Sequence, residues 1–262
     1  MFFFELDQLS YLSQIYRQAY AEAQPFPHVV IDNFLPESVL EKVLDEFDCL
    51  TSRNWVKYYS PTENKLTFNQ ESLLGETTYL LLQQLNSSLF VDFLQILTGI
   101  SGLIPDPHFL GAGLHQIKRG GYVKIHADFA RHDRLRLDHR LNLLIYLNKD
   151  WKPEYGGQLE MWNRDMTECI QQVMPIFNRC LIFDTHSYSY HGHPEPLDCP
   201  EWLTRKSLAV YYYTNGRPEE EGNNWHSTLW QTRPGERIHT FNLLTRQLLK
   251  KLIPPALVDP KR

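Results

Sequence analysis

The stretch Tyr122-Val-Lys-Ile-His-Ala-Asp128 decides how this chain is interpreted, together with Ser189-Tyr-His-Gly-His-Pro194 further along. On an extended strand, side chains two residues apart project to the same face, so His126 and Asp128 are predicted to point together. His191 follows His126 by 65 residues and supplies a second imidazole. We predict that these three side chains close one face of a metal site.

The chemistry of this set favours iron. Two neutral imidazoles and one carboxylate form the facial triad of non-haem Fe(II) oxygenases, which leaves coordination positions open for an oxidant and a co-substrate. Arg205 follows His191 by 14 residues and opens the run Arg-Lys-Ser-Leu-Ala-Val-Tyr-Tyr-Tyr213. Its planar guanidinium matches a carboxylate with two hydrogen bonds. We therefore predict that it holds one end of a dicarboxylate whose other end chelates the iron.

Composition limits the function classes. The chain has 262 residues, of which 42% are hydrophobic, enough for one domain with a sizeable core. The formal charge of −5 and the pI of about 6.1 give no clustered basic excess, so we expect no nucleic-acid partner. Four scattered cysteines without a Cys-x-x-Cys pair favour a reducing compartment.

The N-terminus and the apolar runs bear on location. Met-Phe-Phe-Phe runs straight into Glu5 and Asp7 without a basic region or a cleavage site, so no signal peptide is expected. No apolar stretch approaches the roughly 20 residues that span a bilayer. We expect a soluble, cytoplasmic protein without a membrane span, and the sequence leaves its oligomeric state open.

Hydrophobic periodicity predicts helices first and strands afterwards. Helical spacing covers residues 5–23, 37–47 and 71–99, the last broken near Asn86-Ser-Ser88, and a short strand is expected at 28–34. Residues 50–68 indicate a loop with a strand fragment. From about residue 100, short alternating runs predict eight strands, at 111–118, 121–127, 140–147, 157–162, 170–174, 179–184, 187–192 and 205–214. A last helix is expected at 239–252.

Eight short strands at this spacing are typical of a jelly roll. The predicted fold class is mainly β with α additions, a double-stranded β-helix with N-terminal helices packed on it. We expect a single domain over 1–262, made of a helical layer (1–100), the jelly-roll core (101–215) and a C-terminal extension (216–262). Strands two and seven of a jelly roll are neighbours, so His126 and Asp128 at the end of the second strand would meet His191 at the end of the seventh.

Residues 110–215 resemble the 2-oxoglutarate/Fe(II)-dependent dioxygenases, within the prolyl-4-hydroxylase-like branch. The resemblance is carried by Gly120-Gly-Tyr-Val-Lys-Ile-His-Ala-Asp128, Leu143-Leu-Ile-Tyr-Leu-Asn-Lys-Asp-Trp151, Tyr155-Gly-Gly-Gln-Leu159 and the Arg205 run. It implies that His126, Asp128 and His191 bind iron, and that Arg205 and Tyr146 bind the distal carboxylate of 2-oxoglutarate. Gln116 stands where the family often has a tyrosine and is a further candidate contact for the co-substrate.

Strand alternation adds a candidate. Asn142, Leu144 and Tyr146 share one face of their strand, and a buried asparagine among apolar neighbours needs hydrogen-bond partners. A ligand would provide one, so Asn142 joins the predicted co-substrate contacts. Ser207 and Ala209, on the Arg205 face, are small enough to leave room for that ligand.

The resemblance implies a hydroxylase that uses Fe(II), O2 and 2-oxoglutarate, stimulated by ascorbate, and that releases succinate and CO2. Its partner would be a small-molecule or peptidyl substrate, with the choice open between a peptidyl proline, an amino acid, and a lipid, sugar or natural-product intermediate. Two other classes stay open. One is a non-catalytic jelly-roll binding module, and the other is a cupin-like metalloenzyme that does not use 2-oxoglutarate.

Some residues have more than one interpretation. His193 and His186 compete with His191 as the third ligand, and the spacing to Arg205 favours His191. The segment 131–140 is either a substrate lid whose arginines hold an anionic group or a solvated loop with internal ion pairs.

Overall fold

The computed structural model describes residues 2–218 and 225–236. The strands are β1 (His28–Asp32), β2 (Val56–Tyr59), β3 (Glu63–Phe68), β4 (Ile104–Pro105), β5 (Gly113–Ile117), β6 (Tyr122–Ala127), β7 (Asp138–Tyr146), β8 (Leu159–Trp162), β9 (Cys169–Val173), β10 (Arg179–Asp184), β11 (His191–His193), β12 (Arg205–Thr214) and β13 (Leu229–Trp230). The α-helices are α1 (Leu6–Glu22), α2 (Glu37–Cys49), α3 (Glu76–Leu85) and α4 (Ser88–Thr98).

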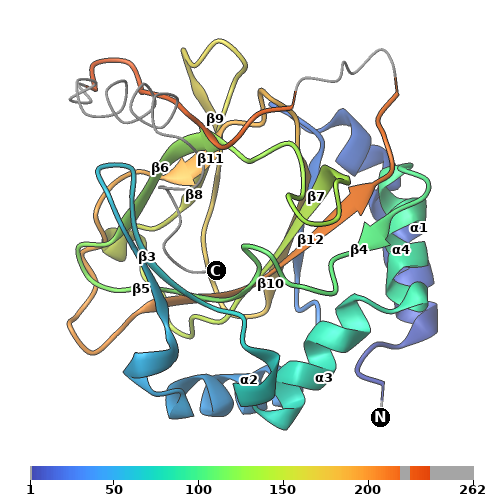
Figure 1. Cartoon of the computed structure of the whole chain (residues 1–262), viewed down its shortest axis with the longest axis horizontal. Coiled ribbons are helices and arrows are strands. Elements are labelled where there is room, and N and C mark those ends of the chain that lie inside the picture. The colour runs from blue at the N-terminus through green and yellow to red at the C-terminus, as the bar shows by residue number, and fades with distance from the viewer. Residues whose placement is uncertain (1, 219–224, 237–262) are drawn as a thin grey trace, which may run out of the picture.

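The strands form one antiparallel sheet that wraps into a nearly closed barrel, with α2 and α3 below it and α1 and α4 to its right (Figure 1). The strand order is β1-β10-β7-β12-β5-β3-β6-β11-β8-β9, with β13, β2 and β4 paired to β6, β3 and β12. This is the double-stranded β-helix that the sequence predicted. All eight predicted strands are present, and β6 pairs with β11 as expected of strands two and seven.

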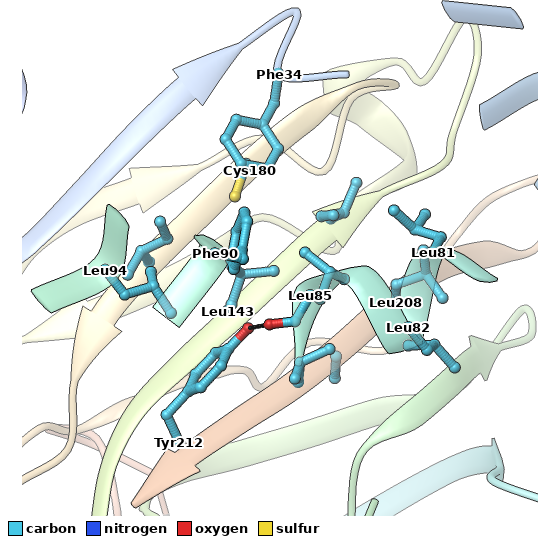
Figure 2. Packing of buried hydrophobic residues seen from close by; sticks show 14 of the residues in the cluster. Phe34, Leu81, Leu82, Leu85, Phe90, Leu94, Leu143, Cys180, Leu208 and Tyr212 are labelled. Carbon is cyan, nitrogen blue, oxygen red and sulfur yellow. Dashed lines mark hydrogen bonds between the residues drawn. The ribbon is translucent and has the colours of Figure 1, made fainter. Parts of the chain in front are cut away.

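The helices cover one outer face of the barrel, because alternation turns one apolar set of each central strand outward. Figure 2 shows side chains of α3 and α4 packed on side chains of β7, β10 and β12. The helix residues include Leu81, Leu82, Leu85, Phe90 and Leu94, and the strand residues include Leu143, Cys180 and Leu208. The Tyr212 hydroxyl donates to the Leu85 carbonyl over 2.8 Å, which satisfies a polar group inside this layer. The leucine-rich helices therefore support the strands that carry the site.

The predicted break between α3 and α4 has a local cause. The Ser87 side chain accepts the backbone N–H of Phe90, which caps α4, and Gly99 ends it in the left-handed conformation at φ 76°. Among the described residues, no single helix has the length and hydropathy of a membrane span. The bent pair α3 and α4 reaches that threshold when taken together.

The structure differs from the sequence prediction in three places. Residues 56–68 form a full hairpin, β2 and β3, and β3 completes the barrel between β5 and β6. The seventh predicted strand starts at His191 instead of ending there, because backbone hydrogen bonds close a tight turn over 186–190. The short strands β4 and β13 were not predicted. The helix expected at 239–252 lies outside the described residues.

Candidate active site

Three side chains meet at the β6–β11 pair. His126 lies on β6, Asp128 follows the last residue of that strand, and His191 opens β11 directly opposite His126. The Asp128 carboxylate lies 3.4 Å from His126 Nε2 and 3.5 Å from His191 Nε2. One potential ligand atom from each residue lies within 4.8 Å of the other two. The predicted triad is therefore assembled with a spacing that suits a single metal ion.

Backbone carbonyls orient both imidazoles. His126 Nδ1 lies 2.9 Å from the Lys124 carbonyl, and His191 Nδ1 lies 2.9 Å from the Ser189 carbonyl. Because a carbonyl only accepts hydrogen bonds, each Nδ1 carries the proton and each Nε2 keeps its lone pair. Burial, followed by the neighbouring His126, lowers the pKa of His191 to about 4. That ring is neutral at pH 7, as a metal ligand must be.

The carboxylate has its own support. Burial works to raise the pKa of Asp128, but the hydrogen bond from His126 and the charges of the surrounding imidazoles, when these rings are protonated, hold it well below its usual range. Asn142 on β7 donates its amide to Asp128 Oδ2 over 2.5 Å. The structure thus places Asn142 against the predicted metal ligand, and its contact with the co-substrate stays a prediction.

Arg205 and Tyr146 form a second cluster inside the barrel. Arg205 is only 4% exposed, its Nε donates to the Gly157 carbonyl, and its guanidinium carbon lies 5.0 Å from the centre of the Tyr146 ring. The buried Arg205 Nη2 and the Tyr146 hydroxyl have no hydrogen-bond partner, and no carboxylate in the described chain pairs with Arg205. Burial lowers the pKa of Arg205 and raises that of Tyr146.

A buried cation without a counter-ion is costly, and a carboxylate that accepts hydrogen bonds from both groups would remove that cost. Gly157 makes the arrangement possible. It has a φ of 77°, and a Cβ there would lie 3.0 Å from Arg205 Cδ and 2.7 Å from a Leu197 methyl group. The Tyr155-Gly-Gly motif therefore leaves space for the arginine.

Comparison with known proteins agrees with this geometry. Residues 112–213 match the 2OG-Fe(II) oxygenase superfamily, a range that includes the triad, Tyr146 and Arg205. The match covers the jelly-roll core of this chain. The chain is 24% identical to mouse prolyl 3-hydroxylase OGFOD1 over 197 residues, which are 73% of this chain and 33% of the relative. It thus spans about a third of the length of that curated relative.

Two solved structures share the fold. A prolyl-4-hydroxylase from Pseudomonas putida has a TM-score of 0.57 at 19% identity, covering 78% of this chain and all of that chain. A Trichoplax adhaerens prolyl hydroxylase, solved with a peptide fragment of the hypoxia inducible factor oxygen degradation domain, has a TM-score of 0.59 at 18% identity, covering 82% and 93%. The fold is that of the prolyl-hydroxylase-like branch, as the sequence predicted.

One predicted contact needs correction. Gln116 pairs across the sheet with Lys206, so the two side chains share the face opposite Arg205, and Gln116 donates to Thr204 Oγ1 over 3.1 Å. Its neighbour His115 pairs with Ser207 and faces inward instead. Burial lowers the pKa of His115 to about 3, with the charges of Lys65 and Arg205 acting in the same direction. His115 therefore occupies the inner position expected for Gln116.

His193 is the other inward group that the sequence left undecided. It is 4% exposed, and neither ring nitrogen has a hydrogen-bond partner. Burial holds its pKa well below the usual range, and the charge of Arg205 adds to that effect. The position two residues after His191 was the only signal in the sequence, and it did not separate a buried ring from a loop histidine.

A pocket of about 550 Å³ lies beside two residues of the triad, His126 and Asp128. It lies between the β2–β3 hairpin, the loop after β6 and the segment 225–230, and His126 and Asp128 form part of its wall. The Trp230 ring packs 4.9 Å from the His126 ring. Trp230 returns to the site from far along the chain, and nothing in the local sequence predicted this contact.

Proposed function

We propose that this oxygenase is a hydroxylase in which His126, Asp128 and His191 hold Fe(II), while Arg205 and Tyr146 hold 2-oxoglutarate. The observation that carries the proposal is that Arg205 Nη2 and the Tyr146 hydroxyl, both buried in the barrel that holds the triad, have no hydrogen-bond partner. The donor set fits both groups, since two imidazoles and a carboxylate suit iron and a guanidinium suits a distal carboxylate.

When bound, iron and 2-oxoglutarate supply the activation of O2, so that C–H, O2 and 2-oxoglutarate become C–OH, succinate and CO2. The chain's own residues bind these two groups and orient the side chains that hold them. The Lys124 and Ser189 carbonyls fix the protons on the Nδ1 atoms of the two imidazoles, and Asn142 fixes the carboxylate. The adjacent 550 Å³ pocket would hold the substrate next to the triad.

We propose a prolyl residue in a peptide as the first substrate to test. The support is the mouse relative, which is named as a prolyl 3-hydroxylase, and the prolyl hydroxylases that share the fold. The pocket also has room for a free amino acid or another small molecule, and a screen for succinate release separates these classes.

The test of the proposed function begins with anaerobic addition of Fe(II) and 2-oxoglutarate, which should give the absorption band of the iron–keto-acid complex. His126→Ala and Asp128→Ala should abolish the band and the release of succinate. Asp198→Ala, which removes an exposed carboxylate paired with Arg119, is the matched control and should change neither. Near-normal succinate release from the triad variants would refute the metal assignment. A binding module, or a cupin-like enzyme without 2-oxoglutarate, would give no such band in the unsubstituted protein.

We further propose that the chain works as one domain in a reducing, cytoplasmic compartment. The N-terminal helices pack on the outer face of the barrel, and all four cysteines are unpaired. Limited proteolysis that releases a stable fragment at the 100/101 boundary, or recovery of the protein outside the cytoplasmic fraction, would contradict these proposals.

A further inference from the structure

The loop that follows Asp128 is held rigidly by a buried histidine. His132 Nδ1 accepts the backbone N–H groups of Arg134 and Leu135 at 3.1 and 3.0 Å, and Nε2 lies 3.3 Å from the Asp106 carboxylate. Because a backbone N–H only donates, Nδ1 is the acceptor and Nε2 carries the proton toward Asp106. His132 and Asp106 are fully buried, and Asp106 also accepts two N–H groups of its own loop. The two loops are fixed to each other.

This loop presents Arg131 in a single orientation. The Arg131 Nε donates to the Arg136 carbonyl over 2.9 Å, and the guanidinium carbon lies 3.6 Å from the centre of the Trp225 ring. Trp225 is fixed in turn, because its Nε1 donates to Asp138 Oδ1 over 3.0 Å. Asp138 forms a backbone bridge with Arg131 itself. The guanidinium therefore lies over an indole ring that is tied to the same loop.

The outer edge of this guanidinium has no counter-ion. Within residues 2–218 and 225–236, no carboxylate lies within ion-pair distance of Arg131. The hydrogen bond of Arg131 to its own loop comes from Nε. Arg131 lines the same pocket as His126 and Asp128. Glu63, on the pocket wall, is already paired with Lys65 over 3.1 Å. A planar fork held in place by stacking is suited to two parallel hydrogen bonds with a carboxylate or a phosphate.

We infer that Arg131 and Trp225 form an anion subsite for the substrate, in which a carboxylate or phosphate group of the substrate pairs with Arg131 while its reacting carbon lies at the triad. This inference rests on the proposed function and narrows the substrate to molecules that carry such a group. Three residues span at most about 10 Å, so the Arg131 backbone lies within about 10 Å of the Asp128 backbone. The anion on Arg131 would lie in the pocket that His126 and Asp128 also line.

Binding to the protein loaded with Mn(II) and 2-oxoglutarate tests the subsite. The probes are N-acetyl-aspartyl amide, its neutral counterpart N-acetyl-asparaginyl amide, and inorganic phosphate, followed by tryptophan fluorescence because Trp225 touches Arg131. Hydrogen bonds to charged groups predict that the acidic probe binds at least about ten-fold more tightly than the neutral one. Stronger binding of the aspartyl probe than of phosphate would assign the group to a carboxylate, and the reverse order to a phosphate.

Variants separate the subsite from the fold. Arg131→Gln should remove the preference for anions, and Arg131→Lys should keep part of it, because charge remains but the planar fork is lost. Arg134→Gln is the matched control, since Arg134 lies on the same loop and does not line the pocket; it should bind like the unsubstituted protein. Equal affinity for aspartyl and asparaginyl probes, or an anion preference that survives in Arg131→Gln, would overturn the inference.

Different measurements test the proposed function and the anion subsite. All three variants should retain the thermal shift that 2-oxoglutarate produces with Mn(II), because Arg205 and Tyr146 are untouched. Loss of that thermal shift in the unsubstituted protein would refute the proposed function. A normal thermal shift without selective anion binding would refute only the anion subsite.

Discussion

Replacing Arg205 by methionine separates ligand binding from stability in this protein. Methionine is of similar length and apolar, so it removes a buried charge that has no counter-ion among the described residues without leaving a large cavity. Without 2-oxoglutarate, Arg205→Met should therefore melt at the same temperature as the unsubstituted protein or higher. With 2-oxoglutarate, the order should reverse, because the unsubstituted protein alone gains the carboxylate contact.

The size of the effect follows from burial. Truncating one partner of a buried, hydrogen-bonded charge pair costs about 2–5 kcal/mol, which weakens 2-oxoglutarate binding by roughly 30-fold to several thousand-fold. At a concentration 100 times its dissociation constant, 2-oxoglutarate stabilises the unsubstituted protein by about 2.7 kcal/mol. For a protein of this size that is a rise in Tm of about 5–10 °C. The same concentration should stabilise the variant by less than about 1 kcal/mol.

Thermal melts with Mn(II), with and without 2-oxoglutarate, measure both quantities. Lys206→Met is the matched control. Lys206 is the next residue on β12 but points to the outer face, where it pairs with Asp48 over 2.5 Å, so its 2-oxoglutarate shift should be unchanged. A full 2-oxoglutarate shift in Arg205→Met would refute the carboxylate site. A large loss of stability in Arg205→Met without 2-oxoglutarate would refute the argument that the buried charge is uncompensated.

Three further perturbations test the site and the core. Asn142→Ala removes the amide that donates to Asp128, and the affinity for Mn(II) in a titration should fall about 10–100-fold; an unchanged affinity would show that the amide does not orient the ligand. Burial lowers the pKa of His115 to about 3. Between about pH 6.5 and about pH 3, the unfolded chain therefore binds a proton at this ring that the folded chain does not bind. The free energy of unfolding of the metal-free protein in urea should therefore fall from about pH 7 to about pH 5, by up to about 1.4 kcal/mol per pH unit from this ring, and a flat profile would contradict the lowered pKa. Leu85→Ala should cost about 2–5 kcal/mol in urea unfolding, against less than about 0.5 kcal/mol for the exposed Leu89→Ala, and equal costs would contradict the packing in Figure 2.

The sequence by itself determined the chemistry of the site and the class of the fold. Metal-ligand types at a spacing of two residues define the His126 and Asp128 pair, and period-two alternation locates the strands within a few residues. Helical periodicity locates α3 and α4 in the same way. These features are local, because each depends on residues a few positions apart, and the pattern records them directly.

The tertiary structure decided what depends on register and on distant segments. The pairing of β5 with β12 turns His115 inward and Gln116 outward, and a shift of one residue would have exchanged them. The contacts of Asn142 with Asp128 and of Trp230 with His126 join segments that only the closed barrel brings together. No local pattern encodes such contacts, because they are set by packing free energy summed over the whole sheet.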